Sequence, residues 1–109
     1  MHELGIARNI VEIVSEAAGG RRVERVRLQI GKLSAVMPDA IRFCFDTCAQ
    51  GTVLEGAALE IDEIPGRGRC NLCSAELALT QLVARCDCGS RDIRCIAGEE
   101  INIKEMEVC

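Results

Sequence analysis

The single histidine of this 109-residue chain stands at position 2, between the α-amine of Met1 and the carboxylate of Glu3. Imidazole is the commonest side-chain ligand of transition metals, and an α-amine titrates close enough to neutrality to bind one as well. Ni²⁺ and Cu²⁺ also displace amide protons and accept square-planar nitrogen ligands. Met1, His2 and Glu3 together could therefore bind such an ion, although a histidine at position 2 is more often an exposed residue on a frayed end.

Five of the eight cysteines gather in one stretch that has few large apolar residues. Cys70 and Cys73 form a C-x-x-C pair, and Cys86 and Cys88 form a C-x-C pair further along. Two cysteine pairs that bracket a short strand are typical of a zinc knuckle or ribbon, in which four thiolates bind a tetrahedral Zn²⁺. Since four thiolates leave no open position, the predicted role is structural. Cys95 lies close enough in sequence to replace Cys86.

Two other uses of these cysteines remain open at this point, a disulfide pair and an iron site of the rubredoxin type. The sequence has no signal-peptide pattern and no apolar run of the roughly 18 residues that a membrane helix needs, so we expect a cytoplasmic protein. In that reducing compartment, clustered cysteines are more often metal ligands than disulfides. The spacing does not separate zinc from iron, but nothing else indicates electron transfer.

The remaining cysteines are interpreted as structural or incidental. Cys44 and Cys48 are four residues apart on the apolar face of a predicted helix, and free cysteine behaves as a small apolar residue there. A metal or redox pair is the alternative reading of these two. Cys109 is the last residue of the sequence, where we expect an exposed thiol prone to oxidation.

Composition argues against two classes of protein. The chain has 13 basic and 17 acidic residues, a formal charge of −4, and two aromatic residues, so nucleic acid is not expected as a partner. A zinc-ribbon interaction or nucleic-acid-binding module is the alternative reading, although this composition opposes its nucleic-acid-binding form. A metalloenzyme is disfavoured because a catalytic zinc needs an open position and a general base, and the histidine is far from the cysteines in sequence.

Apolar periodicity predicts the elements that position these residues. Residues 3–18 show the helical period and end at Gly19-Gly20. Alternation over 23–30 and 57–64 predicts two strands, and Pro38 suits the first turn of a second helix.

The second half of the chain changes character at Pro65–Gly68, where we expect a break. Leu77 and Leu79 alternate with smaller or polar residues and predict a short strand between the two cysteine pairs. After Gly98 the alternation resumes, with a slip in phase that predicts a bulge or a strand end near Lys104-Glu105. We expect this last strand to rejoin the first sheet, which would make the cysteine module an insertion.

With these motifs in place, the chain resembles the HypA/HybF family of hydrogenase nickel-incorporation proteins over essentially its whole length. The matching motifs outside the cysteine module are Met1-His2-Glu3-Leu4, Ile10-Val11-Glu12-Ile13, Ile30-Gly31-Lys32-Leu33-Ser34, Val36, Pro38-Asp39, Phe43-Cys44-Phe45, Gly51-Thr52, Glu55-Gly56-Ala57, Leu59-Glu60-Ile61, Gly98-Glu99-Glu100-Ile101 and Glu107-Val108.

The resemblance implies an α+β fold in two parts. A nickel-binding domain with a small three-stranded sheet packed by two helices would comprise residues 1–66 and 97–109, and an inserted zinc-ribbon-like domain would comprise residues 67–96. The metal ligands that the resemblance implies are Met1, His2 and Glu3 for nickel, and Cys70, Cys73, Cys86 and Cys88 for structural zinc.

The same resemblance implies a metallochaperone rather than an enzyme. Its cargo would be Ni²⁺, delivered with a partner GTPase to the large subunit of [NiFe]-hydrogenase and, in some organisms, to urease through urease accessory proteins. The oligomeric state stays open between monomer and homodimer, and no nucleic acid or membrane insertion is expected.

The sequence departs from the family pattern in two places. The second cysteine pair is normally C-x-x-C, but Arg85 stands where its first cysteine would fall and Cys86 follows one residue later, which keeps Cys95 as the reserve ligand. Some members also recruit a further histidine from the zinc domain to the nickel site. This chain has none, so a fourth nickel donor would be a backbone nitrogen, a carboxylate, water or a group of a partner.

Overall fold

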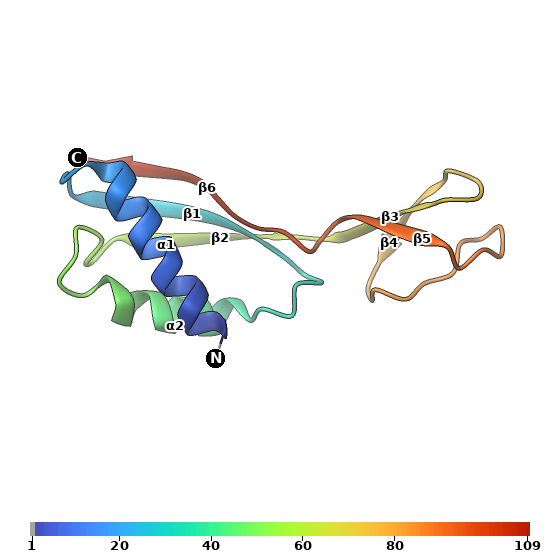
Figure 1. Ribbon diagram of the computed structural model, residues 1–109, viewed down its shortest axis with the longest axis horizontal. Coiled ribbons are helices and arrows are strands. Elements are labelled where there is room, and N and C mark those ends of the chain that lie inside the picture. The colour runs from blue at the N-terminus through green and yellow to red at the C-terminus, as the bar shows by residue number, and fades with distance from the viewer. Residues whose placement is uncertain (1) are drawn as a thin grey trace.

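The computed structural model describes residues 2–109, apart from the side chain of His2. Two lobes follow each other along a molecule of 53 × 25 × 17 Å (Figure 1). We call the part that contains both helices the helical lobe, and the part that contains the clustered cysteines the cysteine lobe. In chain order, the elements are α1 (His2–Ala18), β1 (Val23–Gly31), α2 (Pro38–Ala49), β2 (Ala58–Ile64), β3 (Gly66–Cys70), β4 (Glu76–Leu79), β5 (Ile93–Ala97) and β6 (Ile101–Val108).

The helical lobe contains a three-stranded sheet in the order β2-β1-β6. β1 pairs with β2 in parallel, with α2 in the connection between them, and β6 pairs with the other edge of β1 in the antiparallel sense. The predicted return of the last strand to the first sheet is therefore confirmed. Of the two alternatives predicted near Lys104-Glu105, the structure has the bulge, because the pairing passes from Arg27–Glu105 to Leu28–Ile103 and leaves Lys104 without a partner residue in β1.

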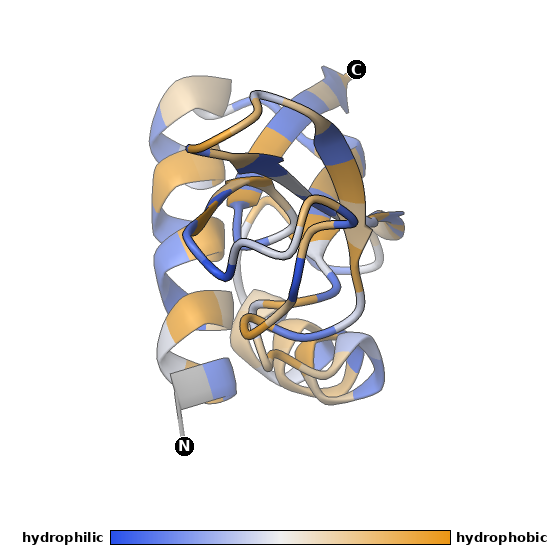
Figure 2. Cartoon of the chain, turned by 90° about the vertical axis from the view of Figure 1, so that its right-hand side faces the viewer, coloured by the Kyte–Doolittle hydropathy of each residue, from blue (hydrophilic) through white to orange (hydrophobic). Residues whose placement is uncertain are grey.

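Both helices bury their apolar faces on one side of this sheet. Polar and apolar bands alternate along α1 in Figure 2, as the sequence period predicts. Leu28 of β1, Ile41 and Phe45 of α2 and Val14 of α1 are almost completely buried in one cluster. Each such side chain contributes about 1.5–3 kcal/mol by leaving water, so this cluster is the main source of stability of the lobe.

The opposite face of the sheet is polar and carries ion pairs. Arg25 of β1 donates to Glu60 of β2 at 2.8 Å and to Glu107 of β6 at 3.0 Å. Arg27 also donates to Glu60, at 2.9 Å, and pairs with Glu105 at 3.1 Å. The alternation of β1 thus places apolar side chains toward the helices and arginines between two acidic strands. Within residues 2–109, neither helix has the length and apolar character that crossing a membrane requires.

The cysteine lobe is built on a second sheet, in the order β4-β3-β5. The break predicted over residues 65–68 is wrong beyond Pro65, because β3 already begins at Gly66 and continues to Cys70. The glycines serve close packing instead of a turn. A Cβ atom on Gly66 would lie 2.3 Å from the carbonyl oxygen of Leu79, and one on Gly68 would lie 2.7 Å from the side chain of Ile93.

The two lobes meet where the end of β1 lies between the connecting strands. The N–H of Gly31 donates to the carbonyl of Glu100 at 2.7 Å, and the N–H of Leu33 donates to the carbonyl of Gly98 at 2.7 Å. Gly98 has a φ of 109°, and a Cβ atom there would lie 2.6 Å from Cα of Gly66. The junction therefore depends on backbone-to-backbone packing that side chains larger than hydrogen would disrupt.

Candidate metal centre

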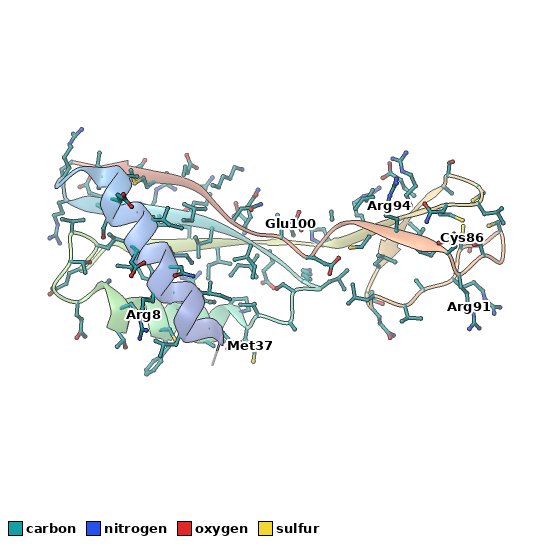
Figure 3. All side chains as sticks on the ribbon, viewed as in Figure 1. Arg8, Met37, Cys86, Arg91, Arg94 and Glu100 are labelled. Carbon is teal, nitrogen blue, oxygen red and sulfur yellow. The ribbon has the colours of Figure 1, made fainter. Side chains whose placement is uncertain are left out.

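Four cysteines converge at the far end of the cysteine lobe, where Figure 3 labels Cys86. The sulfur atoms of Cys70, Cys73, Cys86 and Cys88 all lie within 4.8 Å of one another. Cys70 Sγ lies 3.7 Å from Cys88 Sγ, and Cys73 Sγ lies 3.5 Å from Cys86 Sγ. These separations are far longer than the ~2.0 Å of an S–S bond, so the four side chains are free thiols gathered around a common centre.

Two tight turns bring the sulfurs together. In the first, the N–H of Ser74 donates to the carbonyl of Cys70 at 2.9 Å, directly after β3 ends. In the second, the N–H of Gly89 donates to the carbonyl of Cys86 at 2.8 Å, and Gly89 has a φ of 95° that suits glycine. Each turn folds one cysteine pair back on itself, so both members of the pair face the same centre.

The thiols of this cluster differ in acidity. The backbone N–H of Cys73 donates to the sulfur of Cys70, and together with the N–H of Leu72 it lowers the pKa of Cys70 to about 6. The backbone N–H of Ser90 lowers the pKa of Cys88, but burial and the neighbouring thiols outweigh it and raise that pKa to about 12. Mutual repulsion thus opposes full ionisation. A divalent cation would offset the thiolate charges and displace the protons.

The donor set fits a tetrahedral metal ion. With Zn–S bonds of ~2.3 Å, the sulfurs of a regular ZnS₄ site lie ~3.8 Å apart, close to the 3.5 and 3.7 Å separations observed here. Cys70 and Cys86 are buried, and Cys73 and Cys88 are exposed, so the centre lies at the surface of the lobe. All four positions would be filled by thiolates, which suits a structural role.

Cys95, the reserve ligand considered from the sequence, lies outside this cluster. Its sulfur donates to the carbonyl of Ala97 at 3.3 Å, and burial raises the pKa of its thiol. The structure brings Cys86 to the other three cysteines instead. Sequence spacing could not separate these two residues, because the turn closed by Gly89 decides which thiol reaches the centre.

The candidate nickel ligands fall largely outside the described residues. Met1 is not described, and nothing is described of the His2 side chain. Glu3 lies in the first turn of α1. Among the described residues, no second group of three or more histidine, cysteine or acidic side chains comes as close together as the four cysteines.

The other cysteines agree with their predicted surroundings. Cys48 packs against the apolar core of the helical lobe, Cys44 is half-buried, and Cys109 is exposed.

The sequence analysis did not predict one group of ion pairs in the cysteine lobe. Arg67 and Arg69 of β3 both donate to Glu76 of β4, at 2.6 and 2.7 Å. The alternation of arginine and glycine in β3 is the sequence signal for these ion pairs, because it gives the strand one charged and one closely packed face.

Comparison with known proteins places the whole chain in one group. The family model described as hydrogenase/urease nickel incorporation, metallochaperone, HypA matches residues 1–108. A hydrogenase maturation factor HypA of Trichormus variabilis is 63% identical over 108 residues, which cover 99% of this chain and 96% of that protein. The HypA of Geobacter metallireducens is 49% identical over 109 residues and covers 99% of both chains.

Two solved structures share the fold. The solution structure of a HypA protein has a TM-score of 0.76 and 24% identity, with 100% of this chain and 97% of the other covered. The solution structure of the Ni metallochaperone HypA from Helicobacter pylori has a TM-score of 0.72 and 23% identity, with 97% and 96% covered. The two-lobed α+β architecture with two three-stranded sheets is therefore that of these proteins.

Proposed function

The chain belongs to the HypA family of hydrogenase/urease nickel-incorporation metallochaperones, and on that premise we propose that it binds Ni²⁺ through Met1, His2 and Glu3 and delivers it to the large subunit of [NiFe]-hydrogenase. The observation that carries this proposal is the family match over residues 1–108 in a chain whose sole histidine follows the initial methionine. Urease, reached through its accessory proteins, is a second client in this proposal. Release would proceed by ligand exchange, because a terminal segment can pass its donors one by one to those of an acceptor.

The cysteine lobe has a separate role in this proposal. Cys70, Cys73, Cys86 and Cys88 hold a structural Zn²⁺, and sulfur separations close to those of a tetrahedral site support this assignment. Zinc enclosed by four thiolates has no position for a substrate, and the chain acts as a carrier rather than as a catalyst. The proposed domains are residues 1–66 with 97–109 for nickel, and residues 67–96 for zinc.

Partners follow from the same premise. A maturation factor of this family works with other proteins of the nickel pathway, and we assign a GTPase as the partner that assists release. The chain has 17 acidic and 13 basic residues, so basic surfaces on partners are the more favourable docking sites. We place this exchange in the cytoplasm, where free thiols persist.

Nickel titration of the tag-free protein tests the cargo site. We expect about one Ni²⁺ per chain, bound more weakly than zinc. The affinity for Ni²⁺ should fall by at least about 10-fold in His2→Ala, because His2 supplies the only imidazole in the sequence. An N-terminal extension should weaken binding as well if the α-amine is a ligand. Cys109→Ser is the matched control, since it removes an exposed thiol and should leave nickel affinity unchanged.

Nickel affinity that is unchanged in His2→Ala would overturn the terminal site. A chain that binds zinc but no nickel would favour the second candidate, a zinc-ribbon interaction module. For the zinc ligands, Cys86→Ser should release metal and Cys95→Ser should not, as measured by zinc content and competition with a chelator. Zinc loss in Cys95→Ser alone would contradict the proposed ligand set.

A further inference from the structure

One face of the sheet in the cysteine lobe is rich in arginine. The side chains of β3 alternate between two faces, so Gly68 and Cys70 are buried, whereas Arg67 is exposed and Arg69 is half-buried. On the neighbouring strand β5, the exposed residue Arg94 lies directly opposite Arg69. We call Arg67, Arg69 and Arg94 the arginine face. Because Cys70 points to the other face of β3, the arginine face lies apart from the cysteine centre.

The arginine face already binds one carboxylate of this chain. Arg67 donates to one carboxylate oxygen of Glu76 at 2.6 Å, and Arg69 donates to the other at 2.7 Å. These arginines, Arg67 above all, hold the pKa of the Glu76 carboxyl below its ordinary value. Guanidinium groups that converge in this way are suited to recognising carboxylates.

Glu76 does not use the full capacity of this face. The Nε–H of Arg69 is buried and has no acceptor among the described residues. Arg94 has no ion pair within residues 2–109 and faces the positive charge of Arg69 across the strands. Like charges directly opposite each other in a sheet are unfavourable. A second carboxylate, placed between Arg69 and Arg94, would remove this repulsion.

The distribution of charge along the chain favours an acidic ligand at this place. Residues 66–97 contain five arginines and three acidic residues, whereas the rest of the chain contains eight basic and fourteen acidic residues. The thiolates of the cysteine centre outweigh the charge of a bound Zn²⁺ and would bring this lobe close to neutral. The attraction for an acidic ligand is therefore local to the arginine face, and the helical lobe repels such a ligand.

The surroundings of the face favour a protein segment over a nucleic acid. Both phenylalanines of the sequence lie in α2, so the cysteine lobe has no aromatic side chain on which a base could stack. Ile96 of β5 is 41% exposed, and a slip in the pairing leaves it without a partner residue in β3. An exposed isoleucine two residues from Arg94 suits a segment that carries both acidic and apolar side chains.

We propose that the arginine face is a docking surface for a carboxylate-rich segment of a partner protein, with one carboxylate bound between Arg69 and Arg94. Ile96 provides the apolar contact beside this ion pair. Docking at this face requires neither nickel nor any ligand of the cysteine centre, because Cys70 lies on the opposite face of β3. The contact would resemble the one that Arg67 and Arg69 already make with Glu76.

Fluorescence anisotropy of a short, labelled, glutamate-rich peptide, titrated with the full zinc-loaded chain, tests this surface. We expect a dissociation constant between about 10 μM and 1 mM at about 50 mM salt, and binding at least about 10-fold weaker at about 0.5 M salt, because salt screens exposed charges. The same peptide with every glutamate replaced by glutamine should not bind.

Two charge reversals in the same lobe separate the arginine face from its surroundings. Arg94→Glu should weaken binding of the peptide by at least about 10-fold, because it places a carboxylate where the ligand would bind. Arg91→Glu is the matched control, since Arg91 is exposed, has no ion pair within residues 2–109 and lies on the other side of the lobe from Arg94 in Figure 3. This control should change the affinity by less than about 2-fold at moderate salt.

Arg94→Lys gives an independent result. It keeps the charge but loses the planar fork, so we expect binding about 3-fold weaker than that of the wild type. Unchanged zinc content checks that each variant retains the cysteine lobe. A wild-type chain that does not bind the peptide at about 50 mM salt, or equal losses in Arg94→Glu and Arg91→Glu, would overturn the proposal. An oligonucleotide that bound more tightly than the peptide and depended on Arg94 would also overturn it and assign the face to nucleic acid.

Discussion

The two lobes of this molecule are stabilised in different ways. The helical lobe buries a continuous cluster of aliphatic side chains and Phe45 between two helices and a sheet. Among the described residues of the cysteine lobe, Leu79 is the one large aliphatic side chain that is buried, together with Cys70 and Cys86. A unit below about 40 residues rarely folds on burial alone, so the cysteine lobe needs a cross-link that the helical lobe does not. The chain thus contains one unit held by its apolar core and one unit whose four clustered cysteines would supply the missing cross-link by binding the proposed zinc.

Removal of the proposed zinc is the largest expected perturbation. Binding of Zn²⁺ to four thiolates is worth about 10–16 kcal/mol in small units of this kind, so chelation or Cys70→Ser should unfold the cysteine lobe. The helical lobe should keep its structure because its core contains none of these cysteines. Hydrogen exchange measured residue by residue should show lost protection at residues 66–97 and retained protection in α1 and β1. Lowering the pH should have the same effect, since protons compete for the thiolates.

Phe45→Ala is the matched perturbation of the other lobe. It should destabilise the helical lobe by about 3–5 kcal/mol through lost burial and a cavity, as measured by urea unfolding, and leave the zinc content unchanged. If both changes unfolded the whole chain in one transition, the two lobes would form a single cooperative unit and the contrast between them would be wrong.

The junction between the lobes is the next place to perturb. Gly98→Ala should cost about 1–3 kcal/mol for the left-handed backbone at a φ of 109°, with a further penalty because the new Cβ would lie 2.6 Å from Cα of Gly66. The N–H of Leu33, which donates to the carbonyl of Gly98, should then exchange faster with solvent.

Gly5→Ala is the control for this glycine substitution. It lies within α1 with no atom within 4 Å of a new Cβ, so alanine should stabilise the helix by about 0.5–1 kcal/mol. Equal effects of the two substitutions would mean that packing at the junction does not distinguish Gly98 from a glycine in an open helix.

The same contrast explains what the sequence could and could not predict. Helix α1, strand β1 and the start of α2 at Pro38 follow from apolar period and local signals, because burial on one face imposes that period. In the cysteine lobe, the alternation of Leu77 and Leu79 predicts β4, but the rest of the lobe buries too few side chains to leave a period, so the sequence does not predict β3 or β5. The break predicted at Gly66 is a strand instead, because glycine occurs both in turns and where backbones pack closely, and the sequence does not separate the two.

The sequence likewise predicts some of the candidate metal ligands better than others. The spacing of Cys70 and Cys73 predicts a turn that faces both thiols to one centre, and the structure has such a turn. The choice between Cys86 and Cys95 depended on a second turn with a positive φ at Gly89, which no spacing rule reports. The nickel ligands proposed at the start of the chain rest on residue types and family resemblance, and the titration with His2→Ala tests whether the imidazole contributes to nickel affinity.

The smallest expected effect concerns the ion pairs on the polar face of the helical lobe. Glu60 accepts hydrogen bonds from Arg27 and Arg25, which hold the pKa of its carboxyl below the ordinary value. A carboxyl whose pKa is lower in the folded state adds stability above its unfolded pKa, and that stability is lost as the pH falls through the folded value. Glu60→Gln should therefore lower the stability only slightly near neutral pH, because the side chain is 43% exposed and its ion pairs are screened by water, and this loss should shrink in acid.

Urea unfolding of the wild type and Glu60→Gln from neutral to acidic pH measures the difference in their free energies of unfolding, with Glu24→Gln as the control. Glu24 lies on the same central strand but is exposed and has no ion pair among the described residues. A cost of Glu60→Gln that stayed constant with pH would assign it to packing rather than to charge. A cost that shrinks as the pH is lowered would show that the ion pairs on the polar face of the sheet add a small, pH-dependent contribution to stability. The larger part of the stability of this lobe would then come from the opposite, apolar face.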